Sequence, residues 1–316
     1  MVESKHQWKA WLYLLPAIVL LLVFTVYPIF NTVRISLLEE YGAMAEMGLD
    51  EGEYFNFGLG NYEKVLQYKD FMLCLKNTAI LCVATVPIST ILALLIAVAL
   101  NSIKPLQKTL QTIFFLPYVT NSIAIGMVFA AMFNIVDYNA ENILNSLSLG
   151  IINNVIQFFG GDPISWINQG SSYMANITVM IVYIVWNALP FKILILLGGL
   201  QSINKQYYDA AKVDGTPKWR VLTRVTVPLL SPMLAYVIIT GFIGGFKEYS
   251  SIVGIFGDKM GPAHDPGLLN TMVGFVYDSI EKDRQGLASA AALILFGIIL
   301  VVTLINNYVI KKRVHY

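Results

Sequence analysis

The sequence has 316 residues, of which 56% are hydrophobic and only 13% are charged. Soluble domains carry about a quarter of charged residues. This composition therefore excludes a disordered chain, a nucleic-acid-binding protein and most soluble enzymes. The formal net charge is +1 and the mean hydropathy is +0.64. Together these values indicate a polytopic membrane protein.

Six long stretches of the sequence contain almost no charged residues, and each can supply the roughly 20 residues with which an α-helix crosses the hydrocarbon. A spanning β-strand needs only about 9–11 residues of alternating polarity, so helices are expected instead. The predicted spans lie near 11–30, 75–100, 109–133, 173–198, 229–250 and 287–310. The first span is too long for a signal-peptide core and is expected to be retained. The sequence therefore predicts an all-α membrane protein, with six transmembrane helices in one domain over 1–316.

Basic residues are distributed unevenly between the segments that the spans separate. The N-terminus, the 101–108 turn, the 199–228 loop and the C-terminal tail share one side, with twelve bases against three acids. The bases are Lys5, Lys9, Lys104, Lys108, Lys205, Lys212, Lys218, Arg220, Arg224, Lys311, Lys312 and Arg313. The other side has seventeen acids and eight bases. Because Lys and Arg are in excess on the cytoplasmic face, both termini are predicted to be cytoplasmic.

The 199–228 loop is the one inner segment longer than a turn, and it is expected to fold as two short helices that meet at a corner. Ser202 or Asn204 is predicted to cap the first helix, which runs through Tyr207–Val213. Gly215 supplies the left-handed residue that ends this helix. Such a corner suits docking to a partner, and a solvated surface hairpin is the simpler alternative.

The second helix of this loop is expected to begin at Thr216, which acts as its cap, with Pro217 at the first helical position. It continues over Lys218–Val227. Pro228 and Pro232 are then expected to bend the chain back into the fifth span, because proline interrupts the helical hydrogen bonds.

The stretch 209–216 reads Asp-Ala-Ala-Lys-Val-Asp-Gly-Thr and is followed by Pro228 and Pro232. It resembles the EAA loop of binding-protein-dependent ABC importer permeases. The family pattern is Glu-Ala-Ala, two residues, Asp-Gly-Ala and a hydrophobic stretch that ends in Pro-x-x-x-Pro, and all spacings match without a gap. The departures are Asp209 for Glu, Thr216 for Ala and Leu222 for Phe.

The resemblance implies that this loop couples the chain to a cytoplasmic ATPase. It implies that Asp209 pairs with a basic residue of the ATPase, while Ala210 and Ala211 allow close approach. The coupling residues expected from the resemblance are Asp209, Ala210, Ala211, Asp214, Gly215, Pro228 and Pro232.

Nearly the whole chain is similar to the sugar-type permeases of the maltose and glycerol-phosphate importers. The residues that carry this similarity are Leu15-Pro16, Tyr27-Pro28, Gly58-Leu59-Gly60-Asn61-Tyr62, Lys76-Asn77-Thr78, Leu116-Pro117-Tyr118 and Gln201-Ser202-Ile203. The resemblance implies the type I ABC importer permease architecture in a bacterial or archaeal cytoplasmic membrane. It also implies that the substrate is a sugar, an oligosaccharide or a related polyol.

The resemblance also implies the partners of the chain. The family pairs two related permeases with a dimer of cytoplasmic ABC ATPases, and an extracytoplasmic solute-binding protein delivers the substrate. A homodimer of this chain is the alternative to a pair of different permeases. Sugar substrate and membrane lipid are the other expected partners, and nucleic acid is not among them.

Catalytic motifs are missing from the sequence. The nearest approach to a nucleotide-binding loop, at 241–248, lacks both the glycine before the lysine and the Ser or Thr after it. His6, His264 and His315 lie at the termini and in an outer loop, so no metal site is expected. We expect no cofactor and no enzymatic activity, with ATP hydrolysis supplied by a separate subunit.

A secondary, ion-coupled transporter is the main alternative, because Lys192, Lys247 and Glu248 lie in or near the predicted spans. The paired inverted repeats with broken helices that mark many such transporters are not visible in the sequence. A membrane-embedded enzyme is a weaker alternative, since no catalytic constellation is found.

The substrate path is expected along the third, fourth and fifth spans. A sugar needs aromatic faces for its C–H surfaces and polar partners for its hydroxyls. Polar residues cluster at the start of the third span, where Tyr118 and Ser122 lie four apart on one helix face and match sugar-contacting positions of the maltose-type permease. The predicted substrate-binding residues are Tyr118, Asn121, Ser122, Asn187, Phe191, Lys247 and Glu248.

These residues also have simpler interpretations. Tyr118 could anchor the chain at the membrane interface and Phe191 could pack against neighbouring helices. Lys247 and Glu248 could form an ion pair near the outer surface.

Overall fold

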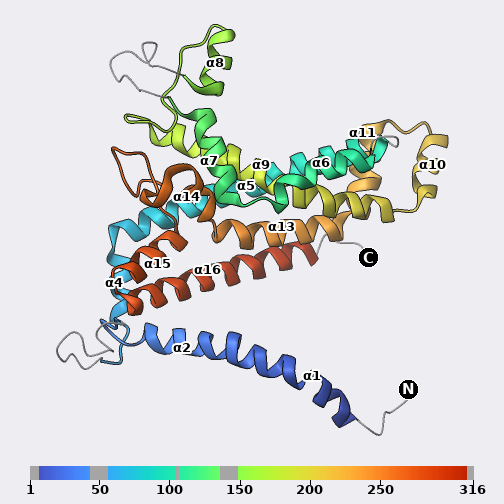
Figure 1. Cartoon of the computed structure of the whole chain (residues 1–316). Coiled ribbons are helices and arrows are strands. Elements are labelled where there is room, and N and C mark those ends of the chain that lie inside the picture. The colour runs from blue at the N-terminus through green and yellow to red at the C-terminus, as the bar shows by residue number, and fades with distance from the viewer. Residues whose placement is uncertain (1–6, 43–55, 104–106, 136–148, 312–316) are drawn as a thin grey trace. The chain divides into compact units, whose positions relative to one another are not determined.

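The computed structural model describes residues 7–42, 56–103, 107–135 and 149–311, which are helical except for turns and loops (Figure 1). The α-helices are α1 Gln7–Leu21, α2 Tyr27–Ser36, α4 Gly60–Gln67, α5 Lys69–Ser102, α6 Gln107–Val119, α7 Ser122–Phe133, α8 Gly150–Phe158, α9 Tyr173–Ser202, α10 Lys205–Val213, α11 Lys218–Val221, α12 Val227–Leu229, α13 Ser231–Phe246, α14 Ser250–Phe256, α15 Met272–Glu281 and α16 Gln285–Lys311. π-helical turns at Leu22–Val26 and Leu222–Thr226 join α1 to α2 and α11 to α12. Of the basic residues above, Lys5, Lys104, Lys312 and Arg313 lie outside the described residues.

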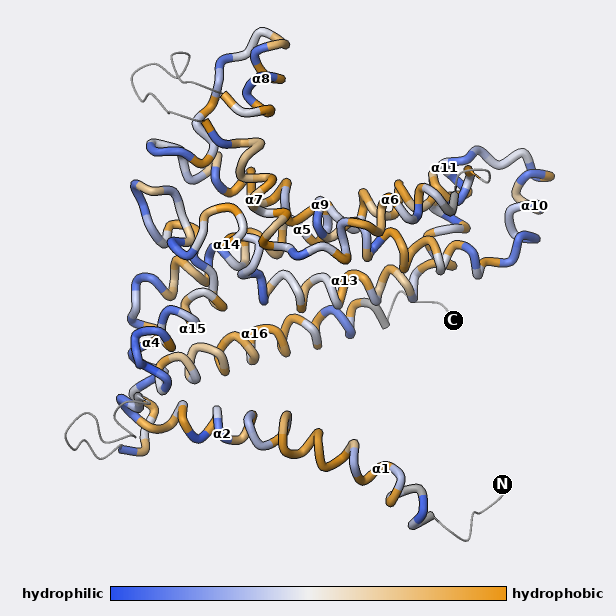
Figure 2. Tube along the Cα trace, viewed as in Figure 1, coloured by the Kyte–Doolittle hydropathy of each residue, from blue (hydrophilic) through white to orange (hydrophobic). Residues whose placement is uncertain are grey.

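Four of the described helical segments are long and apolar enough to cross a membrane, and two bent helix pairs raise the number to six. The four are Trp11–Ser36, Lys69–Ser102, Tyr173–Ser202 and Gln285–Val309. Figure 2 shows that α1, α13 and α16 are hydrophobic along most of their length, while hydrophilic residues gather at α4 and α10. The number and order of the segments agree with the six predicted spans.

The third and fifth spans are bent, and the span predicted near 109–133 consists of two helices. α6 and α7 meet at an angle of 98°, and the segment Lys218–Leu229 meets α13 at 72°. The second bend was expected, because Pro228 and Pro232 stand on either side of it and lack the N–H that a helix interior requires. The first bend falls within the polar cluster of the third span, where Asn121 caps α7. It places Tyr118 on α6 and Ser122 on α7, so the prediction that these two residues share one helix face is wrong.

The described residues form two compact units. The first unit combines residues 1–71 with 275–296, and the second combines 72–274 with 297–316. Helix α9 is the central helix of the second unit, since fifteen of its thirty residues are buried. One half of α9 packs with α5, α7 and α14, and the other half packs with α5 and α13. Both halves of α9 are therefore packed in apolar clusters of the second unit.

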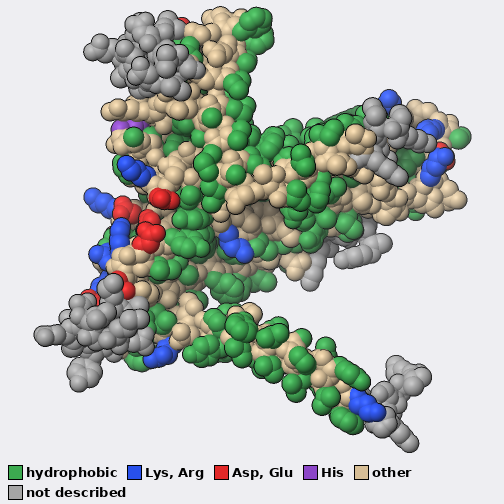
Figure 3. Space-filling view, in the orientation of Figure 1, with side chains coloured by type: hydrophobic (Ala, Val, Ile, Leu, Met, Phe, Trp, Pro, Cys, Tyr) green, Lys and Arg blue, Asp and Glu red, His purple; other side chains and the backbone are tan. Residues whose placement is uncertain are grey.

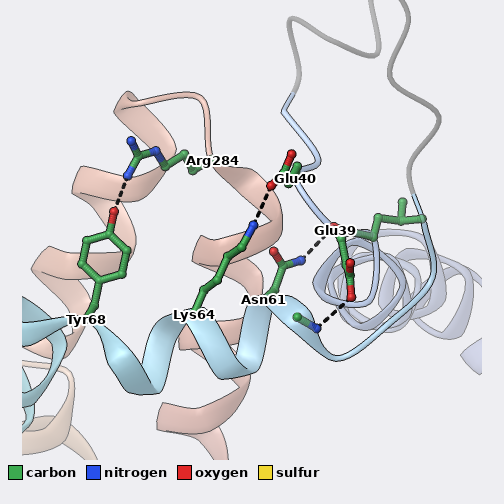
Figure 4. Close-up of polar contacts among 8 residues, drawn as sticks. Glu39, Glu40, Asn61, Lys64, Tyr68 and Arg284 are labelled. Atoms are coloured by element: carbon green, nitrogen blue, oxygen red, sulfur yellow. Dashed lines mark hydrogen bonds and ion pairs between the residues drawn. The ribbon is translucent and has the colours of Figure 1, made fainter.

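In the first unit, a polar cluster joins the end of α2, helix α4 and the turn before α16 (Figure 4). The buried Asn61 side chain donates to the carbonyl oxygens of Ser36 at 3.1 Å and of Leu38 at 2.7 Å. Lys64 pairs with Glu40 at 2.6 Å. The Gly-Leu-Gly-Asn-Tyr stretch that resembles the permease family therefore forms a structural connection between helices.

Candidate functional site

The loop 199–228 contains the predicted helical corner. The Asn204 side chain accepts a hydrogen bond from the N–H of Gln206 at 3.0 Å and caps α10. Gly215 follows α10 with a φ of +62°, in the left-handed region. The N–H of Thr216 donates to the carbonyl of Ala211 at 2.9 Å, and that of Gly215 donates to Lys212 at 3.1 Å. These two bonds form a Schellman motif, which confirms the predicted end of the first helix.

The start of the second helix differs from the prediction. Pro217, with φ of −65° and ψ of 147°, is the capping residue of α11, and no side chain caps this helix. Thr216 is therefore not the cap, and Pro217 stands one position before the helix. The helix begins one residue later than predicted because the carbonyl of Pro217 accepts its first hydrogen bonds, from the N–H groups of Arg220 at 2.9 Å and Val221 at 3.1 Å.

The corner exposes a mixed surface. Asp209 and Lys212 form an exposed ion pair at 3.8 Å. Ala210 is exposed, whereas Ala211 is buried against the rest of the corner. Val213 is 89% exposed. Figure 3 shows Lys and Arg side chains around α10 and α11.

A cavity of about 380 Å³ lies among α5, α6, α7, α9 and α13 of the second unit. Five of the seven predicted substrate-binding residues line it, namely Tyr118, Ser122, Asn187, Phe191 and Glu248. The structure therefore gathers residues from three predicted spans around one hollow.

Aromatic rings form one wall of the cavity. The rings of Tyr118 and Phe191 stack with centroids 5.6 Å apart and planes inclined by 20°. Phe191 also contacts Tyr236 of α13 at 6.4 Å, and Tyr118 contacts Phe115 at 5.5 Å. Tyr118 keeps half of its surface exposed, so one ring of the wall remains open to a ligand.

Hydrogen bonds link the start of α7 to α9 beside the same cavity. The hydroxyl of the buried Tyr183 donates to the backbone oxygen of Ser122 at 2.5 Å and lies 3.1 Å from the Ser122 hydroxyl. The Asn187 amide lies 3.5 Å from that hydroxyl. Tyr183, Asn187 and Phe191 are spaced four apart and share one face of α9. This face holds the bend of the third span in place.

Two of the predicted substrate-binding residues lie elsewhere. The Asn121 side chain accepts hydrogen bonds from the N–H groups of Ile123 at 2.8 Å and Ala124 at 3.4 Å, and it caps α7. Lys247 is exposed and does not line the cavity. Among the described residues Lys247 and Glu248 form no ion pair with each other, so that simpler interpretation is wrong.

Five polar residues of the cavity were absent from the predicted set. Thr85 and Ser89 come from α5, Thr120 lies between α6 and α7, Thr240 comes from α13, and Lys192 comes from α9. The four-residue spacing of Thr85 and Ser89 inside an apolar span was the available signal, because it places two hydroxyls on one helix face. Thr240 precedes Gly241, Gly244 and Gly245, which also line the cavity.

Comparison with known proteins identifies the family. Residues 85–315 match the model of the binding-protein-dependent transport system inner membrane component. The lactose transport system permease protein LacF of Rhizobium radiobacter is 29% identical over 308 residues, or 96% of this chain and 95% of LacF. The arabinooligosaccharides transport system permease protein AraP of Halalkalibacterium halodurans is 30% identical over 254 residues, or 79% and 74% of the two chains.

Solved structures show the same fold. A chain of a bacterial ABC transporter that imports the acidic polysaccharide alginate superimposes with a TM-score of 0.72 at 20% identity, covering 98% of this chain and 96% of its own. The same coverage and score hold, at 21% identity, for an alginate ABC transporter in complex with an alginate pentasaccharide-bound periplasmic protein. These findings confirm the predicted type I architecture. The chain belongs to the family of binding-protein-dependent transport system inner membrane components, the permease subunits of ABC importers.

Proposed function

We propose that residues 1–316 form one permease domain that carries a sugar or oligosaccharide across the cytoplasmic membrane of a bacterium or archaeon. The observation that carries this proposal is the cavity in which the stacked rings of Tyr118 and Phe191 stand beside hydroxyl and amide side chains. Aromatic faces cover the C–H surfaces of a sugar, and fixed polar groups bind its hydroxyls. Relatives named for lactose and arabinooligosaccharides point to the same substrate class.

Five residues are proposed to contact the sugar. Tyr118 and Phe191 offer ring surface, while Ser122 and Asn187 offer hydrogen-bond donors and acceptors. Glu248 offers a carboxylate, which accepts hydrogen bonds from hydroxyl groups.

The corner of the 199–228 loop is proposed to dock on a separate cytoplasmic ATPase subunit. The rigid Schellman turn at Gly215 fixes the direction of α10, and α10 presents the exposed Asp209, Ala210 and Val213. A small exposed residue beside a charged one allows a partner to approach closely and to form an ion pair. Asp214 lies at the end of the same helix and belongs to this surface. Pro228 and Pro232 set the bend that joins the corner to α13.

The complete importer is proposed to contain this chain, a second related permease, two copies of an ATPase and an extracytoplasmic binding protein. The periplasmic protein in complex with the alginate transporter supports the last of these by analogy. Native mass spectrometry of the purified complex counts the permeases directly. Two copies of this chain without a second permease would overturn the heterodimer in favour of a homodimer.

Proteoliposomes containing the purified complex test the proposed function. With the binding protein and a labelled sugar outside and ATP inside, uptake is expected. Substitution of the nucleotide-binding lysine of the ATPase is expected to abolish uptake, and collapse of proton and sodium gradients is expected to leave it unchanged. Uptake that follows the ion gradients and ignores the ATPase variant would establish a secondary transporter instead.

A further inference from the structure

The charges in the cavity balance each other. Among the described residues that line it, Lys192 carries the positive charge and Glu248 the negative charge, while the other side chains are uncharged. Both charges lie in a chain of low charge content, and a buried charge is costly unless it is compensated. The manner in which each charge is held therefore limits the ligands that the cavity accepts.

Lys192 is held by α5 rather than offered to a ligand. Its ammonium group donates to the hydroxyls of Ser89 at 2.7 Å and Thr90 at 2.9 Å, and to the backbone oxygen of Val86 at 3.3 Å. The residue is only 4% exposed. An ammonium group has three N–H donors, so these three bonds use all of them. Among the described residues, no carboxylate forms an ion pair with Lys192.

Helix α13 covers another side of the ammonium group. A Cβ atom on Gly241 would lie 3.3 Å from Lys192 Nζ and 3.2 Å from Val86 Cγ1. The glycine thus allows α13 to pass close to the ammonium group and leaves little room for an anion there. An anionic ligand would have to break existing hydrogen bonds of Lys192 before it could pair with the charge.

Glu248 is held differently. It follows α13, is half-buried, and its carboxylate accepts a hydrogen bond from the N–H of Ser251 at 3.3 Å. A carboxylate accepts hydrogen bonds but does not donate them. It therefore favours the hydroxyls of a sugar and repels a carboxylate or phosphate, while the positive charge of Lys192 opposes the entry of a cation.

We propose that this chain's part of the cavity selects an uncharged sugar unit and rejects uronic acids, sugar phosphates and amino sugars. Glu248 contacts the sugar hydroxyls, and Lys192 is a positioning residue that fixes the α5 hydroxyls and offsets the charge of Glu248. A ligand with a net charge would leave one charge uncompensated in the cavity. The inference deepens the proposed function and rests on it.

Saturation-transfer NMR on the full permease–ATPase complex in nanodiscs, without the binding protein, tests the selection by the permease itself. The probes are glucose with glucuronate and glucosamine, and galactose with galacturonate and galactosamine. If the glucose or the galactose series binds, its neutral sugar is expected to bind at least about tenfold more tightly than its charged analogues, a difference of about 1.4 kcal/mol. Equal binding of neutral and charged analogues overturns the inference and leaves the proposed function intact. The absence of binding by every sugar, together with no sugar uptake, overturns both.

Variants separate charge balance from a structural role. Glu248→Gln is expected to raise the affinity for the uronates relative to the neutral sugar. Lys192→Met is expected to raise the affinity for the amino sugars relative to the neutral sugar. If Lys192 had only a structural role, the substitution would instead weaken the binding of all analogues together. Unchanged selectivity in assembled variants contradicts the inference.

Matched control substitutions remove one positive or one negative charge at residues that do not line the cavity. Lys76→Met and Glu63→Gln alter exposed residues and are expected to leave the selectivity unchanged. An equal shift in these controls would assign the effect to overall charge and overturn the inference. Glu248→Gln leaves the contacts of Lys192 with α5 intact, so it decides the question even where Lys192→Met fails to assemble.

Discussion

The corner at α10 and the cavity around α9 are both polar, but they are built in opposite ways. At the corner, backbone groups of the contiguous residues 204–216 form hydrogen bonds with one another, and most side chains point outward. In the cavity, side chains from α5, α7 and α9 satisfy one another across long sequence separations, such as Ser122 with Tyr183 and Lys192 with Ser89.

This difference teaches which changes each region tolerates. The corner depends on backbone conformation and is sensitive at the residue with positive φ. The cavity depends on side-chain contacts between helices and is sensitive at residues whose atoms face the hollow. Each of the following substitutions separates one of these properties from the other.

Gly215→Val is expected to have the largest effect, because a β-branched residue is strained in the left-handed region. The local cost is about 1–2 kcal/mol, and reorientation of α10 should reduce coupled uptake by roughly tenfold or more. Sugar uptake and ATP hydrolysis by the reconstituted complex are the measurements. Gly198→Val is the matched control, since a Cβ at either glycine meets no atom within 4 Å but only Gly215 has positive φ. Normal coupling by an assembled Gly215→Val complex would contradict the docking role.

Tyr118→Ala removes the exposed ring of the cavity wall and leaves the corner unchanged. Aromatic pairs are worth about 0.5–1.5 kcal/mol, so the apparent KM for sugar uptake is expected to rise by roughly two- to tenfold. Tyr118→Phe retains the stack with Phe191 and is expected to stay near the wild-type value. If both variants transport with wild-type KM, the sugar path does not pass this ring.

Ala210→Leu and Ala211→Leu place the same bulk on the exposed and the buried side of α10. Ala210→Leu should leave the permease stable and weaken its association with the ATPase, measured by co-purification at increasing salt. Ala211→Leu should instead destabilise the corner by about 1–3 kcal/mol through overpacking, measured by thermal unfolding. Identical behaviour of the two variants would show that the exposed face of α10 is not a contact surface.

Asn121→Ala is expected to have the smallest effect on transport, because this side chain caps α7 and does not line the cavity. Loss of the cap should cost about 1 kcal/mol of stability, with unchanged KM. Asn121→Ser should restore most of the stability, since serine also caps helices. A raised KM at wild-type stability would return Asn121 to the set of substrate contacts.

The sequence by itself determined the features that depend on local or periodic properties. Span number follows from runs of apolar residues, and the end of α10 follows from a glycine at the position that requires positive φ. The EAA-like spacing of 209–216 and Pro228 identified the family for the same reason, because it is a contiguous pattern. One local error, the cap at Thr216, arose because the carbonyl of Pro217, one residue later, accepts the first hydrogen bonds of α11.

Only the tertiary structure decided which polar residues meet. Asn121 and Ser122 are neighbours in a polar cluster, yet the 98° bend turns one into a helix cap and places the other in the cavity. Lys192 stands alone among the apolar residues of its span and carries no motif, and the spacing of Thr85 and Ser89 does not say which helix they face. They reach the cavity because α5 and α9 pack closely, and such packing depends on contacts between residues about a hundred positions apart, which no local pattern encodes.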